Sequence, residues 1–105
     1  MDMFEVNFTE TALQDMEEKA DYIAYDLFAP QSAQRWYEQL RNSVMKYLSE
    51  FPEMYPPYPS KTRQGIRYAT FGTDVVLYSV DNAQRRVYVE MVCSNGQNID
   101  ARLEQ

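Results

Sequence analysis

Three basic residues, Lys61, Arg63 and Arg67, lie within a stretch of seven residues. Such cations bind phosphate, and Arg adds a planar fork of five donors that stays charged throughout the physiological pH range. Arg67 stands in GIRYATFGTDVVLYSV, a mainly apolar and aromatic segment that predicts a hairpin of two strands. Alternate residues of a strand share one face, so the small neighbours Gly65 and Ala69 leave the guanidinium room to reach a large anion. These three cations are our candidates for an anion-binding or catalytic site.

The role of Arg67 has two interpretations. It contacts an anion or a partner on the open face of the sheet, or it forms a structural ion pair with Glu90 or Asp74 on adjacent strands. A second basic pair, Arg85-Arg86, falls at the end of a hairpin. There it is either an ordinary solvated turn or a further contact for a target or an anion. The sequence leaves both questions open.

Missing residue types narrow the possible chemistry. The sequence contains no histidine and one cysteine, Cys93, which excludes a zinc site and any Cys–His or Ser–His pair. The three glycines are too widely spaced for a phosphate-binding loop. Asp15, Glu18 and Asp21 have the spacing of one helix face, which is commonplace on solvated helices. We therefore expect no metal and no cofactor, and we expect Cys93 to be a small buried apolar residue.

The charge of the chain is acidic overall and unevenly distributed. The net charge is −6, to which residues 1–60 contribute 4 − 11 = −7 and residues 61–105 contribute 6 − 5 = +1. Autonomous nucleic-acid binding needs clustered Lys and Arg, so we expect none. A local basic surface in the second half is compatible with these totals. No apolar run has the roughly 20 residues of a membrane span, and one cysteine suits a reducing compartment. We expect one cytoplasmic domain over residues 1–105.

Apolar periodicity predicts an α+β fold with the element order β-α-α-β-β-β. Residues 3–8 alternate as a short strand, and Thr9 or Thr11 then caps a helix to about residue 28. Pro30 opens a second helix that ends near residue 51, and the short link makes the two helices an antiparallel hairpin. The segment PEMYPPYPS is a stiff connector. Three strands follow at 66–71, 74–80 and 86–93, and then a short terminal helical turn. The helical hairpin is expected to pack on a small antiparallel sheet.

This pattern resembles the RelE/ParE superfamily of toxins from type II toxin–antitoxin pairs. The resemblance covers almost the whole chain, and the order, spacing and length of its pieces carry it. The pieces are VNFTETALQDMEEKADYIA, A-x-x-W-Y-x-x-L from Ala33 to Leu40, a helix ending at FPEMYPP, GIRYATFGTDVVLYSVD and VYVEMVCSNG. The resemblance implies two helices on a small antiparallel sheet. It also implies a protein that arrests growth when free, as in plasmid stabilisation, and that a cognate antitoxin silences.

The resemblance implies two classes of target, the ribosome and DNA gyrase. RelE-like members cut messenger RNA on the ribosome without a metal, and arginines stabilise the charge that develops on the phosphate. ParE-like members poison gyrase. Arg67 matches the strand arginine of the family's G-x-R pattern, and Lys61 and Arg63 fall where RelE-like members carry basic residues. Residues 94–96, however, read SNG where cleaving members place His, Arg or Tyr. This favours gyrase, with a messenger RNA endonuclease or a degenerate, non-toxic antitoxin-binding protein as alternatives.

The resemblance also implies a binding surface for the antitoxin. The tail of the antitoxin is expected to lie along the helices or to add a strand to the sheet edge. Candidate contacts are Asp15, Glu18, Asp21 and Tyr22 on the acidic side of the first helix. Family members usually present a basic surface to an acidic antitoxin, so this side predicts an unusually basic antitoxin segment.

Overall fold

The elements of the protein follow the order that the sequence predicts. The structure, a computed structural model, describes residues 3–94 and 96–104, so Asn95 after the last strand lies outside the described residues. None of the described helices is both long and apolar enough to cross a membrane. The elements are β1 Glu5–Phe8, α1 Glu10–Asp21, the π-helical turn η1 Tyr22–Asp26, α2 Pro30–Glu50, β2 Arg67–Phe71, β3 Asp74–Asp81, β4 Arg86–Ser94 and α3 Ile99–Leu103.

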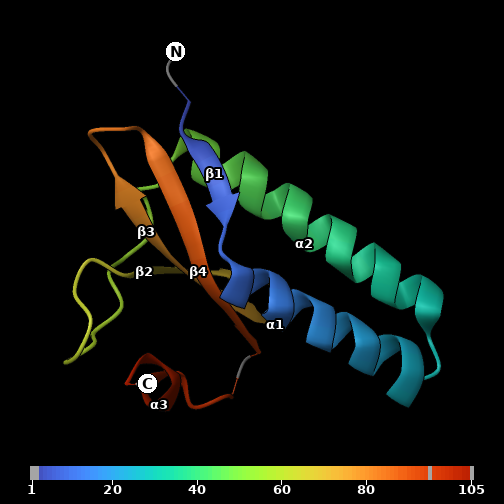
Figure 1. Ribbon diagram of the computed structural model, residues 1–105. Coiled ribbons are helices and arrows are strands. Elements are labelled where there is room, and N and C mark those ends of the chain that lie inside the picture. The colour runs from blue at the N-terminus through green and yellow to red at the C-terminus, as the bar shows by residue number, and fades with distance from the viewer. Residues whose placement is uncertain (1–2, 95, 105) are drawn as a thin grey trace.

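The four strands form one mixed sheet in the order β1-β4-β3-β2. Tight hairpins join β2 to β3 and β3 to β4, so these pairs are antiparallel. β1 runs parallel to β4, with Val6 opposite Val87, and the expectation of a purely antiparallel sheet is wrong at this edge. Parallel neighbours need a long crossover connection. Here the chain that connects β1 to β4 contains both helices and the β2–β3 hairpin (Figure 1).

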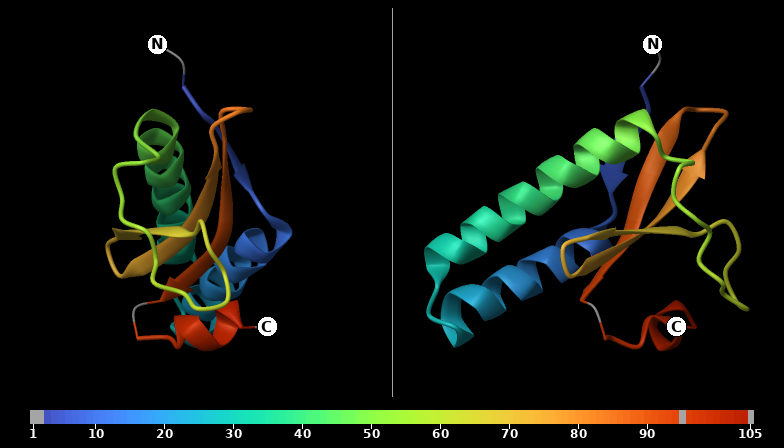
Figure 2. Two further views of the ribbon diagram at one scale, coloured as in Figure 1. Left: turned by 90° about the vertical axis from the view of Figure 1, so that its left-hand side faces the viewer. Right: turned by 180° about the vertical axis from the view of Figure 1, so that it is seen from behind.

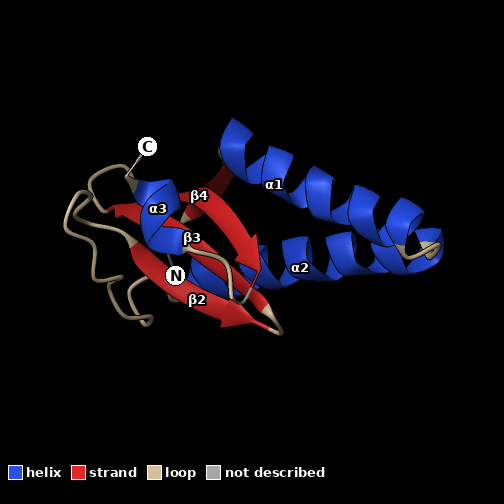
Figure 3. Ribbon diagram, turned by 90° about the horizontal axis from the view of Figure 1, so that it is seen from below, coloured by secondary structure: helices blue, strands red, loops and turns tan. Residues whose placement is uncertain are grey.

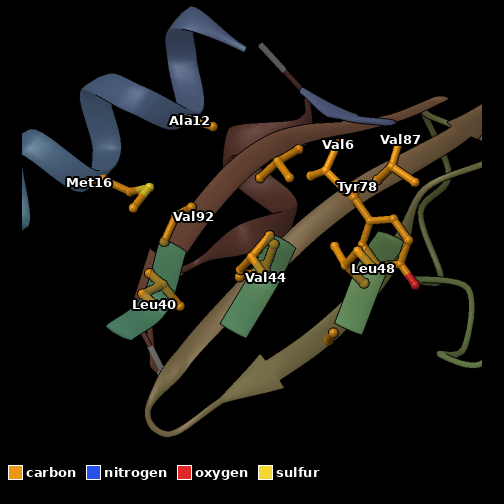
Figure 4. Close-up of a cluster of buried hydrophobic side chains, with 12 residues drawn as sticks. Val6, Ala12, Met16, Leu40, Val44, Leu48, Tyr78, Val87 and Val92 are labelled. Atoms are coloured by element: carbon orange, nitrogen blue, oxygen red, sulfur yellow. The ribbon is translucent and has the colours of Figure 1, made fainter. Parts of the chain in front are cut away.

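The helical hairpin covers one face of the sheet (Figures 1 and 2). Thr9 starts α1 because its hydroxyl oxygen accepts a hydrogen bond of 3.1 Å from the Ala12 amide. Pro30 lies in the first turn of α2, where its missing N–H is not needed. The apolar stripes of both helices then meet the inward side chains of the strands (Figure 4). The resulting main core consists of Val6, Ala12, Met16, Leu40, Val44, Leu48, Ala69, Val76, Tyr78, Val87, Val89 and Val92.

The opposite face of the sheet carries a second, smaller core beside α3. Its members are Ile66, Leu77, Met91, Cys93 and Leu103. Asn98 begins α3, and its side-chain oxygen accepts a hydrogen bond from the Ala101 amide at 3.1 Å. Cys93 is 1% exposed, which confirms that it is a buried apolar residue. α3 therefore covers part of this face, below the sheet in Figure 1, and shields it from solvent.

The far end of the helical hairpin projects beyond the sheet. In Figures 1 and 3, the turn between η1 and α2 lies at the end farthest from the strands. The chain reverses there through Phe28, which has a positive φ of 54°. The hairpin therefore has one half packed against the sheet and a tip that lies beyond the sheet.

Candidate functional site

Arg67 begins β2, and its guanidinium holds the connector, residues 52–60, by the backbone. Nη1 donates to the carbonyl oxygen of Tyr55 at 2.6 Å and to that of Glu53 at 3.3 Å. Prolines keep the connector out of regular helix or sheet, so its carbonyls need partners from elsewhere. A charged donor supplies a stronger bond than a neutral one. The structure thus directs the positive charge of Arg67 to the connector.

The alternative of a structural ion pair for Arg67 is wrong. Within the described residues, Asp74 forms its ion pair with Lys19. Glu90 lies against Arg63, with 3.8 Å between Nη2 and Oε2. Both acids expected as partners of Arg67 therefore have other cations. In the packed fold, the loop before β2 brings Arg63 to Glu90, while Arg67 faces the other way.

Tyr78 on β3 holds the same connector from beside Arg67. The two residues are directly opposite in the register of β2 and β3, so they share the face of the sheet that the helices cover. The expectation of an open face around Arg67 is therefore also wrong. The Tyr78 hydroxyl donates to the carbonyl oxygen of Pro52 at 2.6 Å. Burial raises the pKa of Tyr78, and the nearby charge of Arg67 opposes this rise. Sequence analysis did not identify this hydroxyl contact.

Lys61 and Arg63 lie between the connector and β2, apart from the contacts of Arg67. Lys61 is exposed and lines a small pocket of about 220 Å³ together with Asp100 near the start of α3. Arg63 is half-buried beside Glu90 of β4. The three cations that the sequence grouped as one site thus have three different environments. Their role as a catalytic set stays a prediction.

Arg85 ends the turn from β3 to β4, Arg86 begins β4, and both are exposed. The guanidinium of Arg85 lies 4.3 Å from the centre of the Phe4 ring, a cation–π distance. Arg86 donates to the side-chain oxygen of Gln84 at 3.0 Å, and its Nε lies 3.9 Å from a Glu5 carboxylate oxygen. Such exposed pairs contribute little to stability. Contact of these arginines with a target or an anion stays a prediction.

Asp15, expected as an antitoxin contact, is bound within the molecule. Its two oxygens accept hydrogen bonds from Arg102 at 3.0 and 3.1 Å, and one also accepts the Val92 amide at 3.0 Å. Arg102 in turn lies 3.5 Å from the sulfur of Cys93. Burial raises the pKa of that thiol, and the Arg102 charge opposes the rise. Asp15 therefore fastens α3 to α1 and β4.

The other expected antitoxin contacts are on the surface. Glu18 and Tyr22 line an open groove of about 630 Å³ between α1 and the end of β4. Asp21 is exposed on the next turn toward the tip. Gln14 donates to Glu18 at 3.2 Å on the exposed side of α1. Three of the four expected residues thus remain accessible to a partner.

A buried polar centre, missed by sequence reasoning, joins both helices to the β2–β3 hairpin. Asp74 is 4% exposed and accepts a hydrogen bond from Trp36 Nε1 at 2.8 Å, in addition to its ion pair with Lys19. The Lys19 ammonium lies 5.0 Å from the centre of the Trp36 ring, which adds a cation–π contact. The sequence feature that could have indicated this centre is the acid Asp74 directly after the Gly72-Thr73 turn. Its cation lies 55 residues earlier in the chain, so local sequence does not identify it.

Comparison with known proteins places the fold among toxin–antitoxin structures. A chain of the chromosomal ParDE system from P. aeruginosa superposes with a TM-score of 0.74 at 18% identity, with 90% of this chain and 99% of that chain covered. A chain of the RelBE2 complex from Mycobacterium tuberculosis gives 0.65 at 22% identity, with 89% and 99% covered. A chain of the intact E. coli RelBE complex gives 0.56 at 15% identity, with 90% and 99% covered. Similarity at these identities shows the shared fold.

The sequence itself carries the family assignment. No curated protein sequence matches the chain. A sequence model of the ParE toxin of type II toxin–antitoxin systems, parDE, matches residues 6–98. This match includes both helices of the hairpin, the connector, β2, β3, β4 and all of β1 except Glu5. The chain therefore belongs to the ParE family of toxins of type II toxin–antitoxin systems.

Proposed function

We propose that this toxin arrests growth by binding DNA gyrase in the cytoplasm, and that it does not cut RNA. The observation that carries the proposal is that Arg67 and Arg63 have partners within the chain and do not converge on one point. Cleavage of a phosphodiester needs cations that converge where charge develops. Arg67 instead donates to connector carbonyls, and Arg63 lies against Glu90. A sequence without histidine also lacks the commonest general base.

The same proposal assigns the antitoxin to the acidic side of the helical hairpin. Glu18, Asp21 and Tyr22 are accessible there, at the groove between α1 and β4. Carboxylates at the rim of a groove favour a partner segment with Lys or Arg at matching positions. Asp15 contributes indirectly, because it holds α3 at the other wall of this groove. A cognate antitoxin with a basic segment is the expected partner.

Gyrase inhibition by the purified chain tests the target. Increasing amounts of the toxin are added to gyrase holoenzyme, ATP and relaxed plasmid, and supercoiling is followed on gels. We expect supercoiling to fall with toxin concentration, and the antitoxin encoded beside the toxin to restore it. The matched control is Lys61→Ala/Arg63→Ala. We expect this variant to inhibit gyrase as the wild type does, because the proposal gives these cations no catalytic role.

Two other outcomes have distinct signatures. Codon-positioned cuts in translated messages that the Lys61→Ala/Arg63→Ala variant no longer makes, with supercoiling by gyrase unaffected, would make the protein a ribosome-dependent endonuclease. Normal growth at high soluble expression, together with a stable antitoxin complex, would make it a non-toxic binding module. Either result contradicts the proposed target.

A further inference from the structure

The turn of the helical hairpin exposes an unusual amount of apolar and aromatic surface. Four neighbouring side chains are more than half exposed: Tyr22 at 52%, Tyr25 at 72%, Leu27 at 54% and Phe28 at 88%. We call residues 21–28 the hairpin tip. Single exposed apolar side chains are ordinary on a protein surface, but four of them within seven residues are typical of a binding surface. The tip contributes little to the core of its own chain.

The backbone at Phe28 supports a role other than folding. Its φ of 54° is a left-handed conformation, which Gly or Asn adopts more easily than a bulky aromatic residue. The ring is 88% exposed, so packing within the chain does not compensate for this strain. Strained residues of this kind concentrate at functional sites. The π-helical turn η1 directly before it is likewise a feature often found at such sites.

The charge of the tip determines the kind of partner that fits. Between Lys19 and Arg35 the sequence has no basic residue, whereas Asp21 and Asp26 lie within the tip and Glu18 lies one turn earlier. The charged residues within the tip are therefore all acidic. Two copies of the tip facing each other would repel, which disfavours a symmetric dimer through this surface. A partner with Lys and Arg around an apolar recess is complementary in both respects.

The shape of the hairpin fits insertion into such a recess. The tip projects away from the sheet (Figures 1 and 3), and Tyr25 and Phe28 are its most exposed side chains. Aromatic anchors that enter an apolar pocket are typical energetic centres of protein interfaces. Surfaces lined with Lys and Arg are typical of proteins that neutralise nucleic-acid phosphates.

We propose that the hairpin tip is the target-docking element of this toxin, which inserts into an apolar recess edged by basic residues on a nucleic-acid-binding protein. The inference rests on the proposed function, because it assigns the contact through which the toxin reaches its target. Asp21 and Tyr22 belong both to the tip and to the proposed antitoxin surface. A bound antitoxin therefore covers one side of the docking element, which explains how it neutralises the toxin.

Variants that alter the tip without disturbing the core test this inference. Phe28→Gly removes the exposed ring and relieves the positive φ, and Tyr25→Ser removes the second anchor. Asp21→Asn/Asp26→Asn removes charge only. Phe51→Ser is the matched control, since Phe51 is a similarly exposed aromatic residue, at 54%, beyond the opposite end of α2. Each variant is compared with the wild type for thermal unfolding, growth arrest at matched soluble level, antitoxin binding, and binding to gyrase holoenzyme at low and high salt.

The inference predicts a specific pattern. Phe28→Gly unfolds at the same or a higher temperature than the wild type, yet it loses growth arrest and binds the target at least about ten-fold more weakly. Tyr25→Ser also loses growth arrest, and the double Asn variant loses the salt dependence of target binding. Phe51→Ser behaves as the wild type. Antitoxin binding is retained by Phe28→Gly and Tyr25→Ser, which lie outside the shared residues.

Each contrary result has its own meaning. Full growth arrest by the Phe28→Gly and Tyr25→Ser variants overturns the inference and leaves gyrase inhibition as a separate question. Loss of antitoxin binding with growth arrest intact assigns the tip to the antitoxin and also overturns the inference. A concentration-dependent dimer that Phe28→Gly abolishes does the same in favour of a second copy. Growth arrest that depends on the tip while wild-type toxin leaves gyrase unaffected supports the inference and refutes gyrase as the target.

Discussion

Arg67→Ala is expected to destabilise the protein, because the side chain holds the connector rather than an external anion. Its Nη1 donates to two carbonyl oxygens, at 2.6 Å to Tyr55 and at 3.3 Å to Glu53. Hydrogen bonds that involve a charged group contribute roughly 1.5–3 kcal/mol each, and exposed ones contribute less. The longer bond is exposed, so we expect a total loss of about 2 kcal/mol in the free energy of unfolding.

A second variant on the neighbouring strand tests whether the connector is the cause. Tyr78→Phe leaves the Pro52 carbonyl without the bond of 2.6 Å that it accepts from the hydroxyl, and an unsatisfied buried group costs about 1–3 kcal/mol. If both side chains hold the connector, either substitution alone already releases part of it. The second substitution then lowers the free energy of unfolding by a smaller amount. The double variant should therefore lose less than the sum of the single losses, by about 1 kcal/mol.

Urea unfolding followed by far-UV circular dichroism measures these quantities at neutral pH. Arg67→Met is the control for the apolar stem, since it keeps side-chain volume but has no donor. It should lose nearly as much stability as Arg67→Ala. For a chain of this size, about 2 kcal/mol corresponds to a fall of roughly 10 °C in the melting temperature. A loss below about 0.5 kcal/mol in Arg67→Ala, combined with loss of growth arrest, would refute the reasoning and make Arg67 a contact residue after all.

Three further perturbations follow from the structure. Asp74→Ala leaves the Lys19 ammonium without its carboxylate, and we expect a loss of about 3 kcal/mol in denaturant unfolding; an effect below about 1 kcal/mol would show that the pair does not hold the helices. Asp15→Ala removes the acceptor of Arg102, so amide hydrogen exchange in α3 should accelerate more than in α2, whereas uniform acceleration would contradict a local fastening role. Burial raises the pKa of Tyr78 above its ordinary value of 10.0, so the folded state keeps a proton that the unfolded state releases. The stabilisation by its hydroxyl is therefore complete below pH 10 and declines as the pH rises above it. The stability difference between wild type and Tyr78→Phe should shrink in that range, and a constant difference would contradict it.

Local patterns in the sequence were sufficient for the order of elements and for the fold class. Apolar spacing of three and four residues predicted both helices, and the short link before Pro30 predicted that they form a hairpin. The turn at Gly72, which has a φ of 62° in the structure, and the alternating residue pattern on either side of it predicted β2 and β3. These features depend on residues within one turn or one hairpin of each other, which is why a single sequence reveals them.

Tertiary packing decided the partners of the charged residues and hence the candidate site. Arg67 had two plausible acceptors in the sequence, Glu90 and Asp74, besides an external anion or partner, and packing gave it backbone carbonyls of the connector. Asp15 looked like any other acid of a solvated helix until Arg102, 87 residues away, reached it from α3. The parallel pairing of β1 with β4 also depends on how the whole chain between them packs.

The sequence by itself determined the fold class, the absence of histidine-based and zinc chemistry, and the family pattern. The tertiary structure alone decided which charges remain at the surface and which are used inside. The physical reason is that secondary structure responds to short-range periodicity, whereas an ion pair depends on the docking of elements far apart in the chain. Identical side chains are equivalent in sequence, and only packing distinguishes the carboxylate that fastens a helix from the one that meets a partner.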